Sequence, residues 1–467
     1  VLDCRMKMPM HQMNGSTLRI INWGLSALSI SMMNWPMTKL YLVFLFAWLS
    51  TILFPLTVQA VQQDPPLISE IAVDGHKVTK EYILRREIQH PVNAPYDSVL
   101  AEEDRNRIDN LGIFSTVEVL LLPGDNGAQI LSYKVIESWR IFPAPIIMYE
   151  EETGWSFGGL LFLKNFRGRD EDLSVFATFG RREVGGFGFN DPWIMGDHVS
   201  IRGHLYYNLS EHLFLPHEYR ELDLETTIGR YFGYQWKVWG TVSVEKRWID
   251  FFSEEEQDVE HQYFQTKFQL IYDTRNIYQD PSEGIYIDTQ LRPEFGLNDD
   301  SPNITELYFT ARAYKLLIPG KKKWVAGLSL SFRKYFGESI PYKTVSVGGA
   351  ESVRGWEVLD STLYAVESFR SGLNSYFFSA ELRQTLIPKR LTRFGTEFGL
   401  ILAEFFDLGA ADDNFSHMFS EDPIIGTGIG LRFYVPGNML FRVDYSIGYH
   451  DNEWRIPKWH ISVGHKF

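Results

Sequence analysis

The last part of the chain alternates between apolar and polar residues over long stretches. In residues 441–449, 425–435 and 459–467, one set of alternate positions is mostly apolar, and the positions between them are polar or glycine. The first set is Phe441, Val443, Tyr445, Ile447 and Tyr449, the second runs from Ile425 to Val435, and the third is Trp459, Ile461, Val463 and Phe467. Successive side chains of a strand point to opposite faces, so this period predicts strands with one apolar and one polar face.

The same alternation extends back to Trp139, and turn signals divide it into about sixteen strands without a helix between them. Short turns such as Pro319-Gly320 alternate with longer polar loops, the longest of them Glu338–Asn374. An even number of two-faced strands with unequal connections at the two ends is typical of a transmembrane barrel that is apolar outside and polar inside. We therefore predict an all-β, sixteen-stranded antiparallel barrel over residues 139–467.

Residues 67–138 have a different, mixed pattern. A strand at Leu67–Val73 is followed by two amphipathic helices, Lys80–Gln89 with Thr79 as its cap and Tyr96–Leu111. Two strands then follow, Phe114–Leu122 and Ala128–Glu137. The order β-α-α-β-β predicts a small α+β domain ahead of the barrel.

The apolar run Leu40–Leu56 lies directly after Met37, Thr38 and Lys39, and small residues near Ala60 suit a cleavage site. Such a run is either a cleaved signal peptide or a short membrane anchor, and the cleavage site favours a signal peptide over residues 37–60. Residues 1–36 show no period and stay unassigned. An over-extended reading frame that precedes a start at Met37 would account for them.

Composition narrows the chemistry. The net charge of −14 argues against nucleic acid as a partner, and the aromatic content of 15% suits the interfacial girdles of a barrel. The one cysteine, Cys4, excludes a disulfide framework. The twelve histidines show no ligand spacing on a helix, so His198 and His204 are better explained as residues of the barrel interior or girdle than as metal ligands. We find no catalytic set, and no cofactor or metal is predicted.

The long loop contains Val353, Arg354, Gly355 and Trp356 after two glycines. With this tip the chain resembles the BamA/TamA-like superfamily of outer-membrane assembly and translocation barrels, whose sixth outer loop carries a Val-Arg-Gly-aromatic motif. Further stretches support the likeness, among them the strand-turn element with Asp273, Arg275, Pro281 and Gly284, the stretches around Glu381 and Asp407, and Asn190 to Trp193. Residues 67–138 are similar to the polypeptide-transport-associated (POTRA) domain of that family.

The phase of the strands gives a separate argument about the carboxylates of Glu381 and Asp407. The apolar set around Glu381 and the apolar set around Asp407 both face outward, so the two carboxylates are predicted to point into the barrel. An arginine on an inward-folded loop could pair with both, because a guanidinium suits carboxylates geometrically. The resemblance implies that Arg354 does so and holds the loop tip inside. The alternative from spacing alone is an exposed arginine and two solvated acids.

The resemblance also implies a weak seam between the first and last strands. Pro143 and Pro145 cannot donate ladder hydrogen bonds at the start of the first strand, and Gly464 interrupts the last one. Either these are ordinary features of strand ends, or they mark a gate where client strands add. The terminal Phe467 is similar to the C-terminal signal of barrel proteins.

By this resemblance, the protein is no enzyme and inserts proteins into the outer membrane or moves them across it. The expected partners are outer-membrane lipids, unfolded or partly folded client proteins, and periplasmic chaperones or accessory proteins. The N-terminal domain is then expected in the periplasm. A passive pore or structural surface antigen is the alternative, and an outer-membrane lipase or protease is disfavoured because no Ser-His set lies at inward positions.

Overall fold

The computed structural model describes residues 65–467, apart from residues 151–153, 181–182, 196–197, 213–214, 216, 254–256, 339–342, 394–395, 421 and 436–438. The predicted signal peptide at 37–60 and the unassigned residues 1–36 therefore lie outside the described part of the chain. No helix within that part combines the length and the apolar character needed to cross a membrane.

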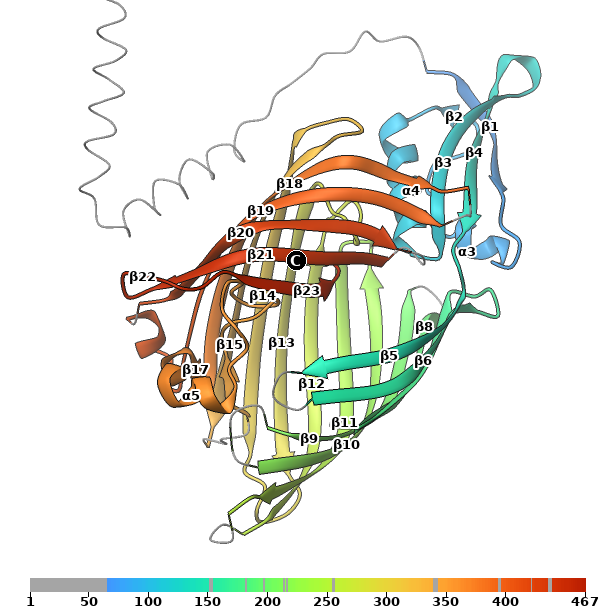
Figure 1. The fold of residues 1–467 in the computed structure, drawn as a ribbon. Coiled ribbons are helices and arrows are strands. Elements are labelled where there is room, and N and C mark those ends of the chain that lie inside the picture. The colour runs from blue at the N-terminus through green and yellow to red at the C-terminus, as the bar shows by residue number, and fades with distance from the viewer. Residues whose placement is uncertain are drawn as a thin grey trace, which may run out of the picture. The chain divides into compact units, whose positions relative to one another are not determined.

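A small α+β domain comes first, drawn in blue to cyan in Figure 1. Its sheet has the order β2-β1-β4-β3, in which β1 and β4 are parallel and β3 and β4 antiparallel. The elements are β1 (Leu67–Asp74), α3 (Glu81–Arg85), β2 (Ala94–Pro95), α4 (Ser98–Asn110), β3 (Phe114–Pro123), the 3-10 turn η1 (Asp125–Gly127) and β4 (Gln129–Glu137). Ile68, Leu84, Ile108, Phe114 and Tyr133 are among its fully buried core residues. The structure thus contains the predicted elements and adds the two-residue strand β2.

Both helices are shorter than predicted. The carboxylate of Asp97 accepts hydrogen bonds from the backbone amides of Val99 and Leu100, which places the start of α4 at Ser98 and not at Tyr96. Thr79 does not cap α3, whose N-cap is Lys80 without a side-chain hydrogen bond. Instead, the amide and hydroxyl of Thr79 both donate to Glu137, each at 2.7 Å. The prediction of Thr79 as a helix cap was therefore wrong.

All strands from β5 onward, except β16 and β17, belong to one large sheet. Its first half comprises β5 (Ile141–Glu150), β6 (Gly154–Phe166), β7 (Glu171–Gly180), β8 (Glu183–Met195), β9 (Val199–Glu211), β10 (His217–Phe232), β11 (Trp236–Phe251), β12 (Val259–Asp273) and β13 (Gly284–Gly296). Its second half comprises β14 (Ile304–Ile318), β15 (Trp324–Gly337), β18 (Asn374–Leu391), β19 (Glu397–Asp412), β20 (Ile424–Val435), β21 (Met439–His450), β22 (Glu453–Trp454) and β23 (Lys458–Val463).

The strands follow one another across this sheet in chain order, from β5 to β23. The registers are antiparallel throughout, for example β5 with β6 and β20 with β21. Both β22 and β23 pair with β21, β22 at Tyr449–His450 and β23 along Phe441–Ser446. The sheet therefore contains seventeen strands in the described residues, where sixteen were predicted, because a short break separates β22 from β23.

The two faces of the sheet have the predicted characters. On β21 and β23, the side chains of Tyr445, Trp459, Ile461 and Val463 are exposed, whereas Arg442, Asp444 and Ser446 between the outward positions of β21 are buried. We call the face with the buried polar side chains the inner face. It is formed by alternate residues of each strand, as a two-residue period requires.

The loop between β15 and β18 has structure of its own. Its described part contains the paired strands β16 (Val345–Ser346) and β17 (Ser371–Gly372), the helix α5 (Ser361–Glu367) and the 3-10 turn η3 (Ser368–Arg370). A further 3-10 turn, η4 (His417–Phe419), lies between β19 and β20. The expectation that no helix follows Trp139 was therefore wrong. Asp360 caps α5 through the amide of Leu363, a local signal that the strand pattern around it concealed.

Glu137 yields a testable prediction for the small domain. Burial by itself would raise the pKa of this carboxyl, but hydrogen bonds from Thr79, Val78 and Lys77 outweigh burial and hold the pKa below its usual value. A lowered folded-state pKa means that its contribution to stability is present above the unfolded pKa and is lost as the pH falls through the folded pKa. Glu137→Gln removes the charge at neutral pH.

We expect Glu137→Gln to cost about 1 kcal/mol in the stability of this segment, so that the amides of residues 77–79 exchange roughly fivefold faster. Hydrogen–deuterium exchange of the full chain at pH 7 and at pH 3 measures this. The difference between the variant and the parent should shrink at the lower pH. Equal exchange at pH 7 would contradict the role of the carboxylate.

Candidate functional site

The tip of the long loop is buried against the inner face of the sheet. Val353 and Arg354 are fully buried and Trp356 is 3% exposed. A fully buried arginine in a loop is unusual, because a guanidinium loses its hydration unless partners replace the water. The contacts of Arg354 therefore decide how this loop is held.

Arg354 contacts three carboxylates from three strands. Its Nε and Nη2 donate to the two oxygens of Asp407 on β19, at 2.7 and 3.0 Å, and its backbone amide also donates to Asp407 at 3.1 Å. Its Nη1 donates to Glu381 on β18 at 2.7 Å and to Asp444 on β21 at 3.1 Å. The face of the guanidinium lies over the ring of Phe405, 3.4 Å from the ring centroid. This two-pronged geometry suits an arginine and could not be reproduced by a lysine.

Other buried charges continue the cluster. Arg383 donates to the second oxygen of Glu381 at 2.8 Å, and Arg432 contacts both Glu381 and Asp444. Lys466 pairs with Asp407 at 2.9 Å. Five cationic side chains, those of Arg354, Arg383, Arg432, Arg442 and Lys466, thus surround the carboxylates of Glu381, Asp407 and Asp444. Such a cluster compensates the desolvation of each charge only while all members are in place.

Small residues on the strands make room for the tip. A Cβ on Gly426 of β20 would lie 1.6 Å from the carbonyl oxygen of Arg354, so the backbones meet at a distance that glycine alone permits. The neighbouring amide of Gly355 donates to Nε2 of His460 on β23 at 2.9 Å. Among the alternating glycines of β20, Gly426 therefore lies where the loop approaches the sheet.

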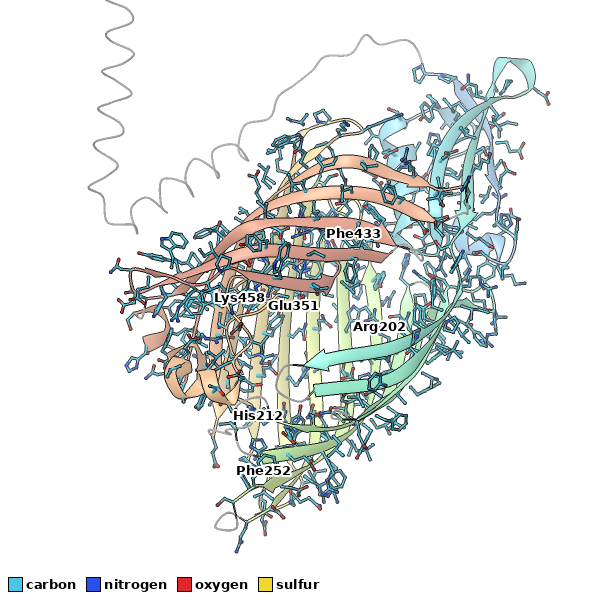
Figure 2. All side chains as sticks on the ribbon, viewed as in Figure 1. Arg202, His212, Phe252, Glu351, Phe433 and Lys458 are labelled. Atoms are coloured by element: carbon cyan, nitrogen blue, oxygen red, sulfur yellow. The ribbon has the colours of Figure 1, made fainter. Side chains whose placement is uncertain are left out.

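Apolar and polar contacts flank the arginine. Val353 and Trp356 pack with Val347, Ala411 and Ile424, and the indole nitrogen of Trp356 donates to the carbonyl of Ile425 at 2.8 Å. On the side of β23, Ser462 donates to Glu351 at 2.6 Å and Lys458 pairs with Glu357. Glu351 and Lys458 are labelled in Figure 2. The loop thus contacts β18, β19, β20, β21 and β23.

The strand-turn residues form a second, separate arrangement between β12 and β13. Arg275 forms a fork with Asp273, with both nitrogen–oxygen distances at 2.9 Å. Asn276 accepts hydrogen bonds from the amides of Ser282 and Glu283, which follow the buried Pro281 and precede Gly284. This set organises a turn of the chain, and these hydrogen bonds are formed within the turn.

Phe467 does not lie where strand phase predicted. Trp459, Ile461 and Val463 are exposed as expected, but Phe467 is only 5% exposed. Gly464 adopts φ +84°, which ends β23 and turns the next residues toward the inner face. There the ring of Phe467 lies 6.3 Å from that of Tyr314, and its carbonyl accepts from Arg383 at 2.6 Å. The prediction that Phe467 points outward was therefore wrong, because the two-residue period of β23 ends at Gly464.

Asp444, Arg432, Arg442 and Lys466 belong to the charged cluster but were not singled out from the sequence. Asp444 and Arg432 occupy inward positions of their strands, so phase alone could have found them as interior residues. Their proximity to Arg354 depends on the register between strands, which phase does not contain. No feature of the sequence pointed to Lys466, because this residue lies beyond Gly464, where the alternation of β23 ends.

Two family models match the chain. Residues 165–467 match the Omp85 superfamily domain, and residues 66–138 match the surface antigen variable number repeat, a POTRA domain. A curated relative is the outer membrane protein assembly factor BamA of Neisseria meningitidis serogroup B, 23% identical over 137 residues. That stretch is 29% of this chain and 17% of the relative, so the chain matches about a sixth of the relative's length.

Solved structures also match the chain. The crystal structure of BamA from Haemophilus ducreyi lacking POTRA domains 1–3 matches with a TM-score of 0.54 and 14% identity, covering 85% of this chain and 84% of that one. CdiB from Escherichia coli matches with a TM-score of 0.49 and 12% identity, covering 88% and 92%. At this identity, the match to the Haemophilus protein shows a shared fold.

The buried charges generate a prediction for Arg354. Arg354→Ala leaves three carboxylates with fewer cations in a buried site, a change that typically costs about 3–5 kcal/mol. We expect the tip to leave the inner face, so that amides of residues 347–357 exchange faster in the full chain by at least about a hundredfold. For Arg354→Lys we expect these amides to exchange at a rate between those of the parent and of Arg354→Ala. Arg220→Ala is the matched control, because Arg220 pairs with Asp250 at the half-exposed end of β10. Equal exchange in the Arg354 and Arg220 variants would contradict the cluster as the restraint.

The close backbone approach at β20 generates another prediction. Gly426→Ala places a methyl group inside the loop backbone, whereas Gly240→Ala on β11 meets no atom within 4 Å. Overpacking of this kind costs about 1–3 kcal/mol, so we expect Gly426→Ala to lower the melting temperature by several degrees and Gly240→Ala to leave it nearly unchanged. Thermal unfolding in detergent, followed by tryptophan fluorescence, measures both. Similar melting temperatures for the two variants would show that the tip is not confined at Gly426.

Proposed function

Because the chain belongs to the Omp85 superfamily, we propose that it inserts proteins into the outer membrane or moves them across it. Members of this BamA-like family lie in the outer membrane with their POTRA domain in the periplasm, and this protein does too. The work on a client is proposed to need no cofactor, because the free energy comes from the client's own folding.

The observation that carries the proposal is the buried contact of Arg354 with Glu381 and Asp407. A buried ion cluster is weak evidence of stability, since apolar residues of the same size often do as well. Its best-attested use is to specify one arrangement among several. We propose that the cluster keeps the loop inside the lumen and aligns β18 to β21, while the neighbouring strands remain able to separate. A passive pore has no need of a loop so specifically held in its lumen.

The proposed barrel has sixteen strand positions, with β22 and β23 as one interrupted last strand. Two observations support a weak seam between that strand and β5. First, β23 has six residues and pairs with six of the twelve residues of β21, Phe441–Ser446. Second, Pro143 and Pro145 remove backbone donors from β5 at positions paired with Leu161 and Gly159 of β6. An edge of this kind suits a client strand that adds by β-augmentation.

The proposed partners are outer-membrane lipids, unfolded or partly folded client proteins and periplasmic accessory proteins. The relative from Neisseria meningitidis is named an outer membrane protein assembly factor, which supports this kind of partner. Since the chain matches 17% of that relative, its clients and accessory proteins remain part of the proposal.

Planar-bilayer conductance of the purified full chain, beside Arg354→Ala, tests the function together with an insertion assay. In that assay, a urea-unfolded eight-stranded barrel protein folds into liposomes with and without the chain. We expect low, flickering conductance that rises in Arg354→Ala, and folding that the parent accelerates more than the variant does. Arg220→Ala should behave as the parent. A large, steady conductance indifferent to Arg354, with no effect on the client, would refute the proposal and make the protein a passive pore.

A further inference from the structure

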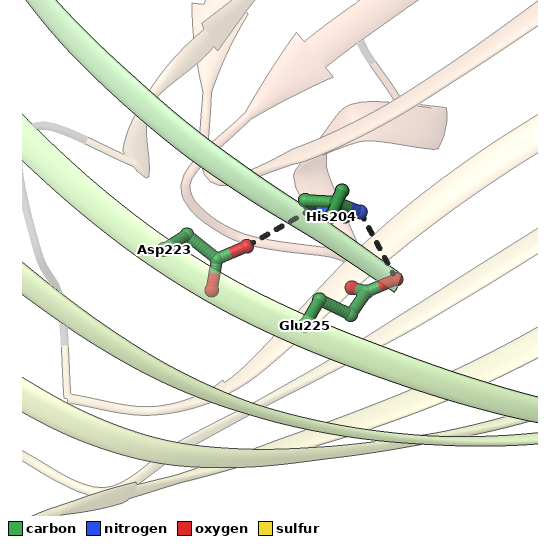
Figure 3. Close-up of side chains that lie close together, drawn as sticks. All are labelled: His204, Asp223 and Glu225. Carbon is green, nitrogen blue, oxygen red and sulfur yellow. Dashed lines mark hydrogen bonds and ion pairs between the residues drawn. The ribbon is translucent and has the colours of Figure 1, made fainter. Parts of the chain in front are cut away.

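Three side chains that could bind a metal ion gather on two neighbouring strands, far along the chain from the Arg354 cluster. His204 lies on β9, and Asp223 and Glu225 lie on β10 (Figure 3). In the register of this strand pair, His204 is directly opposite Glu225, and Asp223 is two residues away on the same face. Antiparallel pairing therefore brings the three groups together without any loop.

The group lies on the inner face and is open to water. Leu205 on β9 and Leu222 and Leu224 on β10, at alternate positions, are exposed on the outer face. The side chain of His204 is 43% exposed, that of Asp223 15% and that of Glu225 20%. An ion arriving through water could reach the imidazole directly, and the carboxylates are partly desolvated, which strengthens their attraction for a cation.

The distances fit the ligands of one ion. One ligand atom from each residue lies within 4.8 Å of the others. Nε2 of His204 is 3.2 Å from Oδ2 of Asp223, and Nδ1 is 3.8 Å from Oε1 of Glu225. Ligand atoms around a tetrahedral ion with bonds of about 2.1 Å are separated by about 3.4 Å. Small side-chain rotations would thus place an ion between them.

The carboxylate of Asp223 supplies an independent observation. Its Oδ1 is buried and has no hydrogen-bond partner within the described part of the chain. A buried carboxylate oxygen without a donor is costly, and a bound cation would satisfy it. We propose that His204, Asp223 and Glu225 bind one divalent transition-metal ion of the zinc or copper class, with water in the remaining position. The imidazole ligand favours these ions over calcium and magnesium, which prefer oxygen ligands alone.

The geometry assigns different roles to the two carboxylates. Since the two ring nitrogens face different acids, an ion at Nε2 is bound most directly by His204 and Asp223. Glu225 completes the site once its side chain has rotated toward the ion. Lys267 on β12 competes with the ion, because its Nζ lies 3.5 Å from Oε2 of Glu225. Thr227 also donates to Oε1 of Glu225 at 3.2 Å. Removing Lys267 should therefore tighten metal binding.

Calorimetric titration of the untagged full chain in detergent with zinc chloride tests the site. We expect one site in the parent that His204→Asn abolishes and that Asp223→Asn weakens by roughly tenfold or more. Lys267→Gln should tighten it. Copper(II) added in place of zinc should give an electron paramagnetic resonance spectrum with nitrogen coupling that disappears in His204→Asn. Circular dichroism before each titration confirms that the variants have kept their strand content.

A matched control comes from another histidine pair. The rings of His212 and His217 lie 4.9 Å apart, and this pair is the alternative location for the one expected site. His217→Asn must therefore leave the site assigned to His204 intact. If zinc binding and the copper spectrum persist in both His204→Asn and Asp223→Asn, or disappear in His217→Asn alone, the proposed site is wrong. Because conductance and client folding are not measured, the result is independent of the proposed function.

Discussion

The guanidinium of Arg354 is the contact on which the arrangement of the long loop depends. It reaches Asp407 with two nitrogens and its backbone amide, and Glu381 and Asp444 with a third nitrogen. Each of these carboxylates belongs to a different strand. One side chain therefore fixes the loop relative to β18, β19 and β21 together, which a single ion pair to one strand could not do.

The inner face of the sheet accommodates this contact because glycines stand where larger side chains would collide. Gly426 has no side chain where the backbone of Arg354 passes, and Gly430 leaves space for the side chains of Asp444 and Arg432. Apolar residues at neighbouring outward positions keep the other face of the same strand suited to lipid. One face of β20 can therefore contact the buried loop while the other face suits lipid, because successive residues of a strand point to opposite faces.

Polar residues on the inner face serve different purposes in different places. Around Arg354 they are fully buried and paired with opposite charges, which favours one fixed arrangement. Around His204 they are partly exposed, and Asp223 has an oxygen without a protein donor in the described residues. The first group holds a segment of the chain itself, and the second is arranged to accept something from solution. Both follow from strands that direct alternate side chains inward.

Much of the large sheet could be predicted from the sequence, because strand period is a local property. The faces of β21 and most of β23, the inward direction of Glu381 and Asp407, and the elements of the small domain all follow from spacing and turn residues. The ends of the helices were predicted less accurately than the strands, since the cap at Asp97 and the contact of Thr79 with Glu137 depend on a few individual hydrogen bonds. Only the tertiary structure decided which inward residues meet. The period assigns a side chain to a face but not to a register, so Asp444 beside Arg354 and Glu225 beside His204 could not be foreseen. The inward turn of Phe467 was equally hidden, because a single glycine at φ +84° ends the pattern that strand phase extends.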